Sequence, residues 1–276
     1  MSIFYGNSDF SFKSIFKVTI SVTGFNVKKE YKGGTMEFIS EVYWDKGGRC
    51  VNQDSVSLQE VWVKGKKAVF ALVCDGIGGL ESGEMASGFV AERMTEWFYK
   101  EAAVLLKKRK NRKRIEKSGL RALYGCNGEM VRFGKEKGIS FGTTVTALLL
   151  TGRRYFLWHS GDTRAYRIVM RKRYLGKIKQ LTKDHAKDHY TLLQCIGSFE
   201  WKKPQVKSGY FIKKSTVLLC SDGLRNRVEE EKMMEAMLPQ LLNSRGQIYG
   251  RLKEMTEYAK KHGEKDNISA VAVRIG

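Results

Sequence analysis

The chain has 276 residues, with 50 Lys and Arg against 29 Asp and Glu and a formal net charge of +21. Its apolar stretches fall short of the ~20 residues that cross a bilayer, and the opening MSIFYGNSDF lacks the regions of a secretory signal. Five cysteines without a CxxC pair indicate neither a disulfide framework nor a zinc site, so we expect a reduced, cytoplasmic protein. The charge is compatible with nucleic acid, an anionic membrane or acidic phosphoproteins, and does not choose among them.

The domain organisation follows from the scarcity of linker sequence. Only two prolines occur, Pro204 and Pro239, and no Pro/Ser-rich segment separates two halves of the chain. Residues 1–35 are weakly patterned, whereas MEFISEVYWDKGG, from Met36, is typical of a strand that ends in a turn. We therefore expect one domain over 36–276, preceded by an N-terminal extension, 1–35, of unknown role.

Aspartates stand repeatedly at the ends of apolar runs. The string AVFALVCDGIGG at 68–79 ends in Asp75 and a glycine-rich turn, and TVLLCSDG at 216–223 places Asp222 in the same way. Asp266 directly precedes the last apolar run, ISAVAVRI. Carboxylates at strand ends suggest a hard-cation site, because Mg2+ and Mn2+ prefer oxygen ligands from separate chain positions.

The remaining elements indicate an α+β fold. Apolar residues recur at helical spacing from 82 to about 106, and 119–137 resembles a second, less regular helix. Short alternating stretches between 140 and 185 are typical of antiparallel strands, and two late helices at 228–242 and 246–263 precede the last strand. Strands interleaved with paired helices predict antiparallel sheets covered by helical layers. The run KKRKNRKR at 107–114 is either a solvated helix end or a site for an acidic partner.

Arg49 lies five residues before Asp54 in RCVNQDS, and an arginine beside metal-binding carboxylates is a plausible phosphate clamp. The ordered motifs then resemble the metal-dependent serine/threonine protein phosphatases of the protein phosphatase 2C type, in their bacterial form. The resemblance runs from about Met36 to the C-terminus and rests on RCVNQDS, VCDGIGGLESGEMAS, SFGTTVTALL, HSGDTRAYRI, QLTKDHA, LLCSDGL and DNISAVAV.

This resemblance implies a four-layer α-β-β-α sandwich of two packed antiparallel sheets flanked by helices. It also implies two Mn2+ or Mg2+ ions and a third, weaker one. Asp75 would bridge the two ions, with Arg49 on the substrate phosphate. The other implied ligands are Asp54, directly or through water, the Gly76 carbonyl, Asp222 and Asp266, with Asp162 for the third ion. The implied activity is hydrolysis of phosphoserine and phosphothreonine in proteins by a hydroxide shared between the ions.

Three departures from the family pattern stand out. Ile77 occupies the position at which animal members carry a histidine, which excludes leaving-group protonation by a histidine there. Leu80 replaces a histidine of bacterial relatives and leaves the metal ligands unchanged. LLQCIGS, at 192–198, replaces the usual motif in a shortened flap beside the active site, so substrate selection is open.

Two further questions stay open at the level of the sequence. His185 and His189 have the i, i+4 spacing of a zinc pair but lack the accompanying glutamate, so we expect no metal there. The expected partners are phosphorylated proteins and a serine/threonine kinase that acts on the same targets, with the chain as a monomer and nucleic acid not expected. The alternatives are a nucleic-acid or anionic-surface binder with a relict site, and a phosphatase dedicated to one regulatory partner.

Overall fold

The computed structural model describes residues 18–22, 36–78, 82–108, 111–172, 175–187, 191–211 and 214–276. Of the predicted extension 1–35, only 18–22 is therefore described. The predictions for Gly79, Leu80 and His189 also lie outside these ranges. Within them, no helix is long and apolar enough to cross a membrane.

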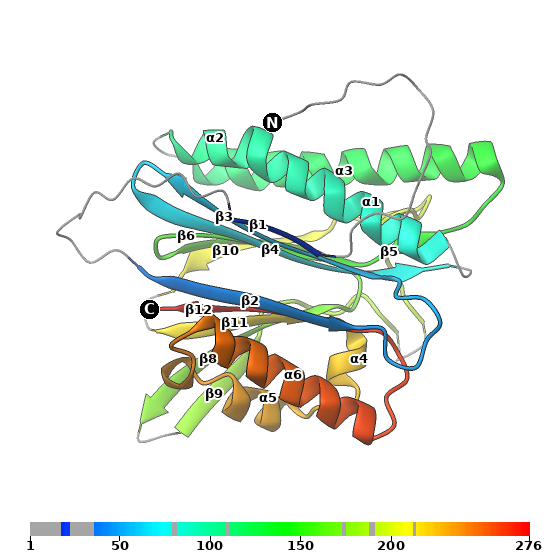
Figure 1. Ribbon diagram of the computed structural model, residues 1–276. Helices are drawn as coiled ribbons and strands as arrows, with labels where there is room; N and C mark the ends of the chain where they lie inside the picture. Colours follow the sequence, from blue (N-terminus) through cyan, green and yellow to red (C-terminus); the bar gives the residue numbers. More distant parts are fainter. Residues whose placement is uncertain are drawn as a thin grey trace.

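Two sheets pack face to face, and helices cover both outer faces (Figure 1). Sheet A has the strand order β1-β3-β4-β6-β7-β10, with β5 paired to β4, and sheet B has the order β2-β12-β11-β8-β9. The strands of sheet A are β1 Val18–Val22, β3 Asp54–Val63, β4 Lys66–Ile77, β5 Gly142–Thr143, β6 Val145–Thr151, β7 Arg154–Ser160 and β10 Gln205–Tyr210. Those of sheet B are β2 Phe38–Asp45, β8 Arg164–Lys172, β9 Leu175–Gln180, β11 Ser215–Cys220 and β12 Ile268–Ile275.

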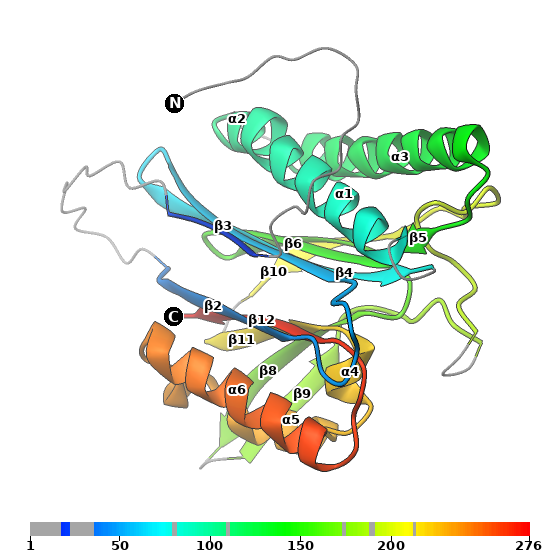
Figure 2. The same ribbon diagram turned by 45° about the vertical axis from the view of Figure 1, so that its right-hand side comes forward.

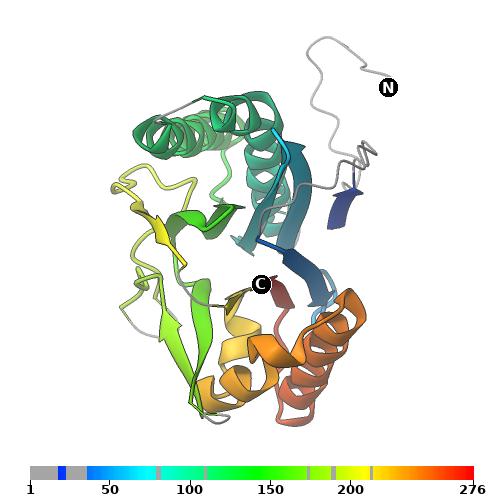
Figure 3. The same ribbon diagram turned by 90° about the vertical axis from the view of Figure 1, so that its left-hand side faces the viewer.

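The helices form the two outer layers, as the view in Figure 3 shows. Over sheet A lie α1 Ser82–Trp97, a π-helical turn Phe98–Ala102, α2 Ala103–Leu106 and α3 Arg112–Lys137. Against sheet B lie α4 Asp222–Arg225, α5 Glu230–Ala236, a 3-10 turn Pro239–Leu241 and α6 Arg245–Lys261. The predicted four-layer sandwich is therefore confirmed.

Three apolar cores hold the four layers together. Phe70, Trp97 and Trp158 belong to the core between the α1–α3 layer and sheet A. Alternate residues of β4, such as Val69 and Val73, point the other way and pack between the two sheets. Because β4 is covered on both faces, its apolar run is almost uninterrupted, which is why the sequence shows no period of two there. The third core joins sheet B to α5 and α6.

Two boundaries differ from the sequence predictions. The helix predicted at 119–137 begins at Arg112, so the end of the basic run forms its first turn. The segment predicted as one helix from 82 to 106 contains the π-helical turn. β1 also pairs in parallel with β3, which makes this one ladder an exception in otherwise antiparallel sheets.

Candidate metal centre

The centre is built at one end of the sandwich, where β4, β5 and the segment that joins β2 to β3 come together (Figure 2). Asp54 begins β3 and Asp75 lies near the end of β4, and the two residues are directly opposed in the ladder. Directly opposed residues project to the same face with Cβ atoms about 5 Å apart. Two carboxylates are thus placed side by side, an arrangement that is unfavourable without a cation between them.

The turn after Asp75 requires glycine at position 76. A Cβ atom on Gly76 would lie 2.0 Å from the carbonyl oxygen of Gly83 and 2.6 Å from that of Gln53. The Gly76 amide donates a hydrogen bond of 3.2 Å to Gln53, and Thr144 ties down Asp75 through a bond of 2.9 Å from the Asp75 amide to its hydroxyl. The backbone at this turn is therefore closely packed and fixed in position.

Sheet B supplies the other carboxylates. Asp222 opens α4 directly after β11, and Asp266 precedes β12, which neighbours β11. Asn267 fixes this edge, because its amide donates to the carbonyls of Lys46 and Val51 at 2.8 and 3.1 Å, while its Oδ1 accepts from the Gln53 amide at 2.7 Å. The loop that carries Arg49 is thereby fastened to the start of β12.

Arg49 and Asp266 form a two-pronged ion pair. The Arg49 Nε and Nη2 atoms lie 3.1 and 2.9 Å from the two carboxylate oxygens of Asp266. The Arg49 side chain is nevertheless 60 % exposed. The guanidinium stands at the rim of the centre with part of its hydrogen-bonding fork open to solvent, where an incoming anion can reach it.

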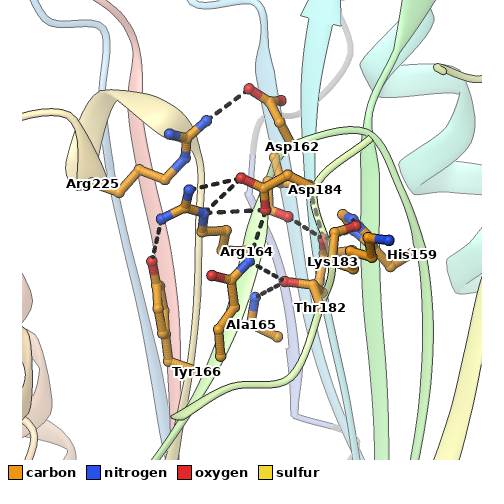
Figure 4. Close-up of polar contacts among 12 residues, drawn as sticks. His159, Asp162, Arg164, Ala165, Tyr166, Thr182, Lys183, Asp184 and Arg225 are labelled. Atoms are coloured by element: carbon orange, nitrogen blue, oxygen red, sulfur yellow. Dashed lines mark hydrogen bonds and ion pairs between the residues drawn. The ribbon is translucent and has the colours of Figure 1, made fainter. Parts of the chain in front are cut away.

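Asp162 is engaged by an arginine that the sequence analysis did not single out. The Arg225 Nη2 atom lies 2.7 Å from the Asp162 Oδ2 atom, and the two side chains are only 6 % and 8 % exposed (Figure 4). The Asp162 Oδ1 atom and the Arg225 Nε atom have no hydrogen-bond partner among the described residues. A third ion at Asp162 would therefore have to share this carboxylate with Arg225 or displace it.

The electrostatics of the carboxylates call for cations. Burial, reinforced by Asp222 and Asp266, raises the pKa of Asp54 to about 7. Burial and the neighbouring Asp162 raise the pKa of Asp222 to about 6. Burial and the carboxylate of Asp54 raise the pKa of Asp75 well above its usual range. These groups lose hydration and repel one another, and divalent cations offset both effects.

The donor set fits Mn2+ or Mg2+. Asp54 Oδ2 is buried without a partner in the described part of the chain, so it is available as a ligand. The candidates offer oxygen atoms alone, which is the preference of both ions. No three His, Cys, Asp or Glu side chains among the described residues are already gathered at ligating distance from one point. Arg49 and Arg225 hold the carboxylates of Asp266 and Asp162 in ion pairs.

A polar network behind Asp162 holds its loop (Figure 4). Arg164 donates to both oxygens of Asp184, with the shortest contact at 2.7 Å. His159 is buried between the Thr146 hydroxyl at 2.9 Å and the Lys183 carbonyl at 3.1 Å. Its ring stacks on that of His185 at 5.0 Å, and His185 Nδ1 accepts from the Gly161 amide. His185 thus contacts the loop that carries Asp162.

Two residues of the centre escaped the sequence reasoning. Asn267 gave a signal, since it adjoins Asp266 in the quoted motif, but its three backbone contacts depend on folding. Arg225 gave a weaker signal, because it lies one helical turn after Asp222 and so faces the same side of α4. The five cysteines carry free thiols, as expected.

Comparison with known proteins identifies the family. A family model for protein phosphatase 2C matches residues 48–257. The chain therefore belongs to the protein phosphatase 2C family, and the resemblance seen in the motifs is confirmed.

Individual relatives are bacterial. The serine/threonine phosphatase stp of Listeria innocua is 27% identical over 245 residues, which covers 83% of this chain and 88% of the relative. The serine/threonine protein phosphatase PstP of Mycobacterium tuberculosis is 26% identical over 223 residues, 74% of this chain and 40% of that protein. Among solved structures, the catalytic domain of PstP in complex with two manganese ions has a TM-score of 0.64 at 23% identity and covers 87% of this chain and 99% of its own. The S. agalactiae serine/threonine phosphatase has a TM-score of 0.70 at 20% identity and covers 86% and 98%.

Proposed function

We propose that the chain is a metal-dependent protein phosphatase that hydrolyses phosphoserine and phosphothreonine, with its catalytic domain over 36–276. The observation that carries the proposal is the direct opposition of Asp54 and Asp75 at a strand end. The pKa values of both carboxyl groups are raised, and bound cations would offset the burial and repulsion that raise them. Family membership and the names of the bacterial relatives support it. The cellular setting that we propose is a cytoplasmic monomer acting on proteins that a serine/threonine kinase has modified.

The ligand assignments follow the placement of the carboxylates. Asp75 is directly opposed to Asp54 in the ladder, and the charge of Asp222 from the other sheet also acts on its carboxyl group, so we assign Asp75 the bridging role. The Gly76 carbonyl, Asp222 and Asp266 would complete the set of ligands for two Mn2+ or Mg2+ ions. Such ions, when bound, lower the pKa of a water molecule and offset charge on the phosphoryl oxygens. Asp162 would hold a third ion, which would compete with Arg225 for the carboxylate.

Arg49 is assigned to the substrate phosphate. Its guanidinium is mostly exposed and forms a planar fork that matches two phosphate oxygens. The contact with Asp266 holds the side chain at the rim before substrate arrives. Arg49 thereby places the phosphate dianion beside the proposed metal ligands. This positioning matters because the uncatalysed hydrolysis of phosphate monoesters is extremely slow. Ile77 is 37% exposed and offers no proton, so the serine or threonine oxygen takes its proton from water.

A cavity of about 610 Å³ borders the centre and is a candidate for the residues that flank the phosphorylated one. It lies between the end of β4, represented by Ile77 and Gly78, and the loop with Cys195 and Phe199. This loop belongs to the predicted shortened flap, and Thr143 and Ile196 tie it to β5 with two backbone hydrogen bonds of 2.9 and 2.8 Å. Phe199 is 75% exposed over the cavity and contacts Lys135 through its ring face.

The deciding experiment compares the native chain with three purified variants on a phosphothreonine peptide with and without Mn2+. Asp75→Asn and Asp222→Asn are expected to lose metal-dependent hydrolysis by at least a factor of about 100, because each removes a charge that holds an ion. Glu254→Gln, on the exposed face of α6, is the matched control and should keep full activity. Full activity in both aspartate variants would refute the proposal. A relict site would instead show no hydrolysis in any of the proteins.

A further inference from the structure

A second site of concentrated charge lies at the opposite end of the sandwich from the metal centre. An open cavity of about 510 Å³ is bordered by the β3–β4 turn, the end of α2 and the β6–β7 turn. We call it the cationic hollow. Its charged lining residues are Lys64, Lys66, Lys107, Lys108, Arg153 and Arg154, and no acidic residue lines it among those that the structure describes. Three separate chain segments therefore bring their cations to one concave surface, which the basic run alone did not reveal.

These cations are not neutralised within the described part of the chain. None of the six lining cations has a carboxylate partner there, although other surface cations do. Lys67, next to Lys66 in β4, shows the contrast, since its Nζ atom lies 2.9 Å from a carboxylate oxygen of Glu60. Like charges gathered around a hollow raise the local potential, and an anion that enters it relieves their repulsion.

One cation of the hollow is held in place in advance. The Arg154 Nη1 atom donates to the Asn111 Oδ1 atom at 2.9 Å, and the guanidinium lies over the ring of Tyr210. Asn111 is only 5% exposed, and its amide nitrogen donates to the Leu105 carbonyl at 3.0 Å. The remaining N–H groups of Arg154 are thus oriented without further ordering of the side chain, which lowers the cost of binding an anion.

One residue of the hollow adopts an unfavourable backbone conformation. Lys64 has a φ of 50° in the turn that joins β3 to β4, a position at which asparagine or glycine is favoured. A lysine at this position costs stability, which is consistent with a requirement for positive charge in the hollow.

We propose that the cationic hollow binds an acidic segment of the phosphoprotein substrate, a stretch of Asp and Glu residues, as a docking site remote from the metal centre. The proposal of a substrate segment rests on the proposed phosphatase function. An acidic peptide fits better than nucleic acid, because single-stranded nucleic acid needs open aromatic faces for its bases. Within the described part of the lining, Tyr210 is the one aromatic residue, and Arg154 already lies over its ring.

The geometry separates the two sites by the length of one hairpin. β3 spans ten residues from Asp54 to Val63 and is paired along its whole length with β4. At about 3.3 Å per residue the strand is roughly 30 Å long. A substrate that reaches both sites gains affinity through effective concentration, without any change at the centre.

Binding can be measured without phosphate chemistry. A fluorescein-labelled peptide of eight glutamates is titrated with the protein at low salt and followed by fluorescence anisotropy. The triple variant Lys66→Glu, Lys107→Glu, Arg153→Glu is expected to bind at least tenfold more weakly than the native chain. The matched control changes net charge equally at three exposed lysines elsewhere, Lys177→Glu, Lys179→Glu and Lys253→Glu, and should bind like the native chain.

The outcomes are separable. Equal weakening in both triple variants, with each shown to be folded by circular dichroism, would mean that only total charge matters and would overturn the proposal. Tighter binding of an eight-nucleotide DNA strand through the same three residues would replace the acidic peptide by nucleic acid and also overturn it. Asp75→Asn should bind the peptide unchanged, so loss of phosphatase activity and loss of docking are read independently.

A kinetic measurement links the hollow to substrate. A phosphothreonine peptide is joined to the eight glutamates by a flexible Gly/Ser linker of about 30 residues, whose mean span of about 30 Å matches the separation. The native chain is expected to show a KM at least tenfold lower for this substrate than for the same peptide with eight glutamines, with kcat unchanged. The hollow triple variant should lose this difference. Equal KM values for the two tails in the native chain would contradict docking.

Discussion

Arg225→Ala removes the internal cation of Asp162, and its effect can be worked out from the contact. Both side chains are more than nine-tenths buried and lie 2.7 Å apart. Loss of one partner from such a buried pair costs about 3 to 5 kcal/mol, since the other charge stays desolvated. Burial already raises the pKa of Asp162, so protonation of the carboxylate brings the cost toward the lower value. We therefore expect about 3 kcal/mol of destabilisation in metal-free protein at pH 7.

Urea denaturation in EDTA measures this cost, and Arg227→Ala is the matched control. Arg227 is 51% exposed and lies 3.9 Å from Glu264, a surface pair worth about 0 to 1 kcal/mol. The Arg225→Ala variant should also bind one more Mn2+ ion than the native chain, three against two, in equilibrium dialysis. An ion present at 100 times its dissociation constant would restore about 2.7 kcal/mol of stability. A variant as stable as the native chain in EDTA, or three ions in both proteins, would refute the reasoning.

Three further predictions follow from single contacts. Gly76→Ala should destabilise the protein by at least about 2 kcal/mol in thermal melts, because the new Cβ meets the Gly83 carbonyl. Gly88→Ala in α1, where a Cβ would meet only the Ser55 hydroxyl at 4.0 Å, should be neutral or stabilising in the same melts. Burial lowers the pKa of His159 to about 3, so the free energy of unfolding should fall as pH drops from about 6.5 toward 3, by up to about 1.4 kcal/mol per pH unit. In urea titrations at several pH values, His159→Gln should show a weaker dependence of this free energy on pH. An unchanged dependence would exclude His159 as its source. Phe199→Ala should raise KM roughly fivefold, about 1 kcal/mol, with kcat unchanged. Leu193→Ala, at an exposed residue outside the cavity lining, should alter neither KM nor kcat. Equal effects of the two substitutions would argue against the cavity as a subsite.

The fold was largely readable from the sequence because its signals are local. The apolar run before Asp75 and the glycine after it specify a strand and a tight turn without reference to the rest of the chain. The start of α3 was placed too late, because Arg112 and its basic neighbours read as a loop. Tertiary packing extends that helix through a segment whose charge pattern argues against it. The parallel ladder of β1 on β3 was also missed, since strand direction leaves no local mark.

The centre was predictable in its residue types and less so in its contacts. Asp54 and Asp75 could be named from motifs, but their direct opposition follows only from the register of a hairpin. The pairing of Arg225 with Asp162 joins positions 63 residues apart and depends on how α4 packs against the β7–β8 loop. The cationic hollow likewise needs three segments to meet. Long-range contacts of this kind carry no periodicity, so a single sequence does not reveal them.

The unbroken β3–β4 hairpin affects which phosphoproteins would be good substrates. The ladder has no break between Val63 and Asp54, so the distance between the metal centre and the cationic hollow is fixed. A substrate that occupies both ends must carry at least about nine residues between its acidic stretch and its phosphorylated residue, even when that connection is fully extended. Phosphosites that directly adjoin an acidic cluster would gain nothing from it. Sites a dozen or more residues away in a flexible segment would be favoured, so spacing along the substrate becomes an element of selectivity.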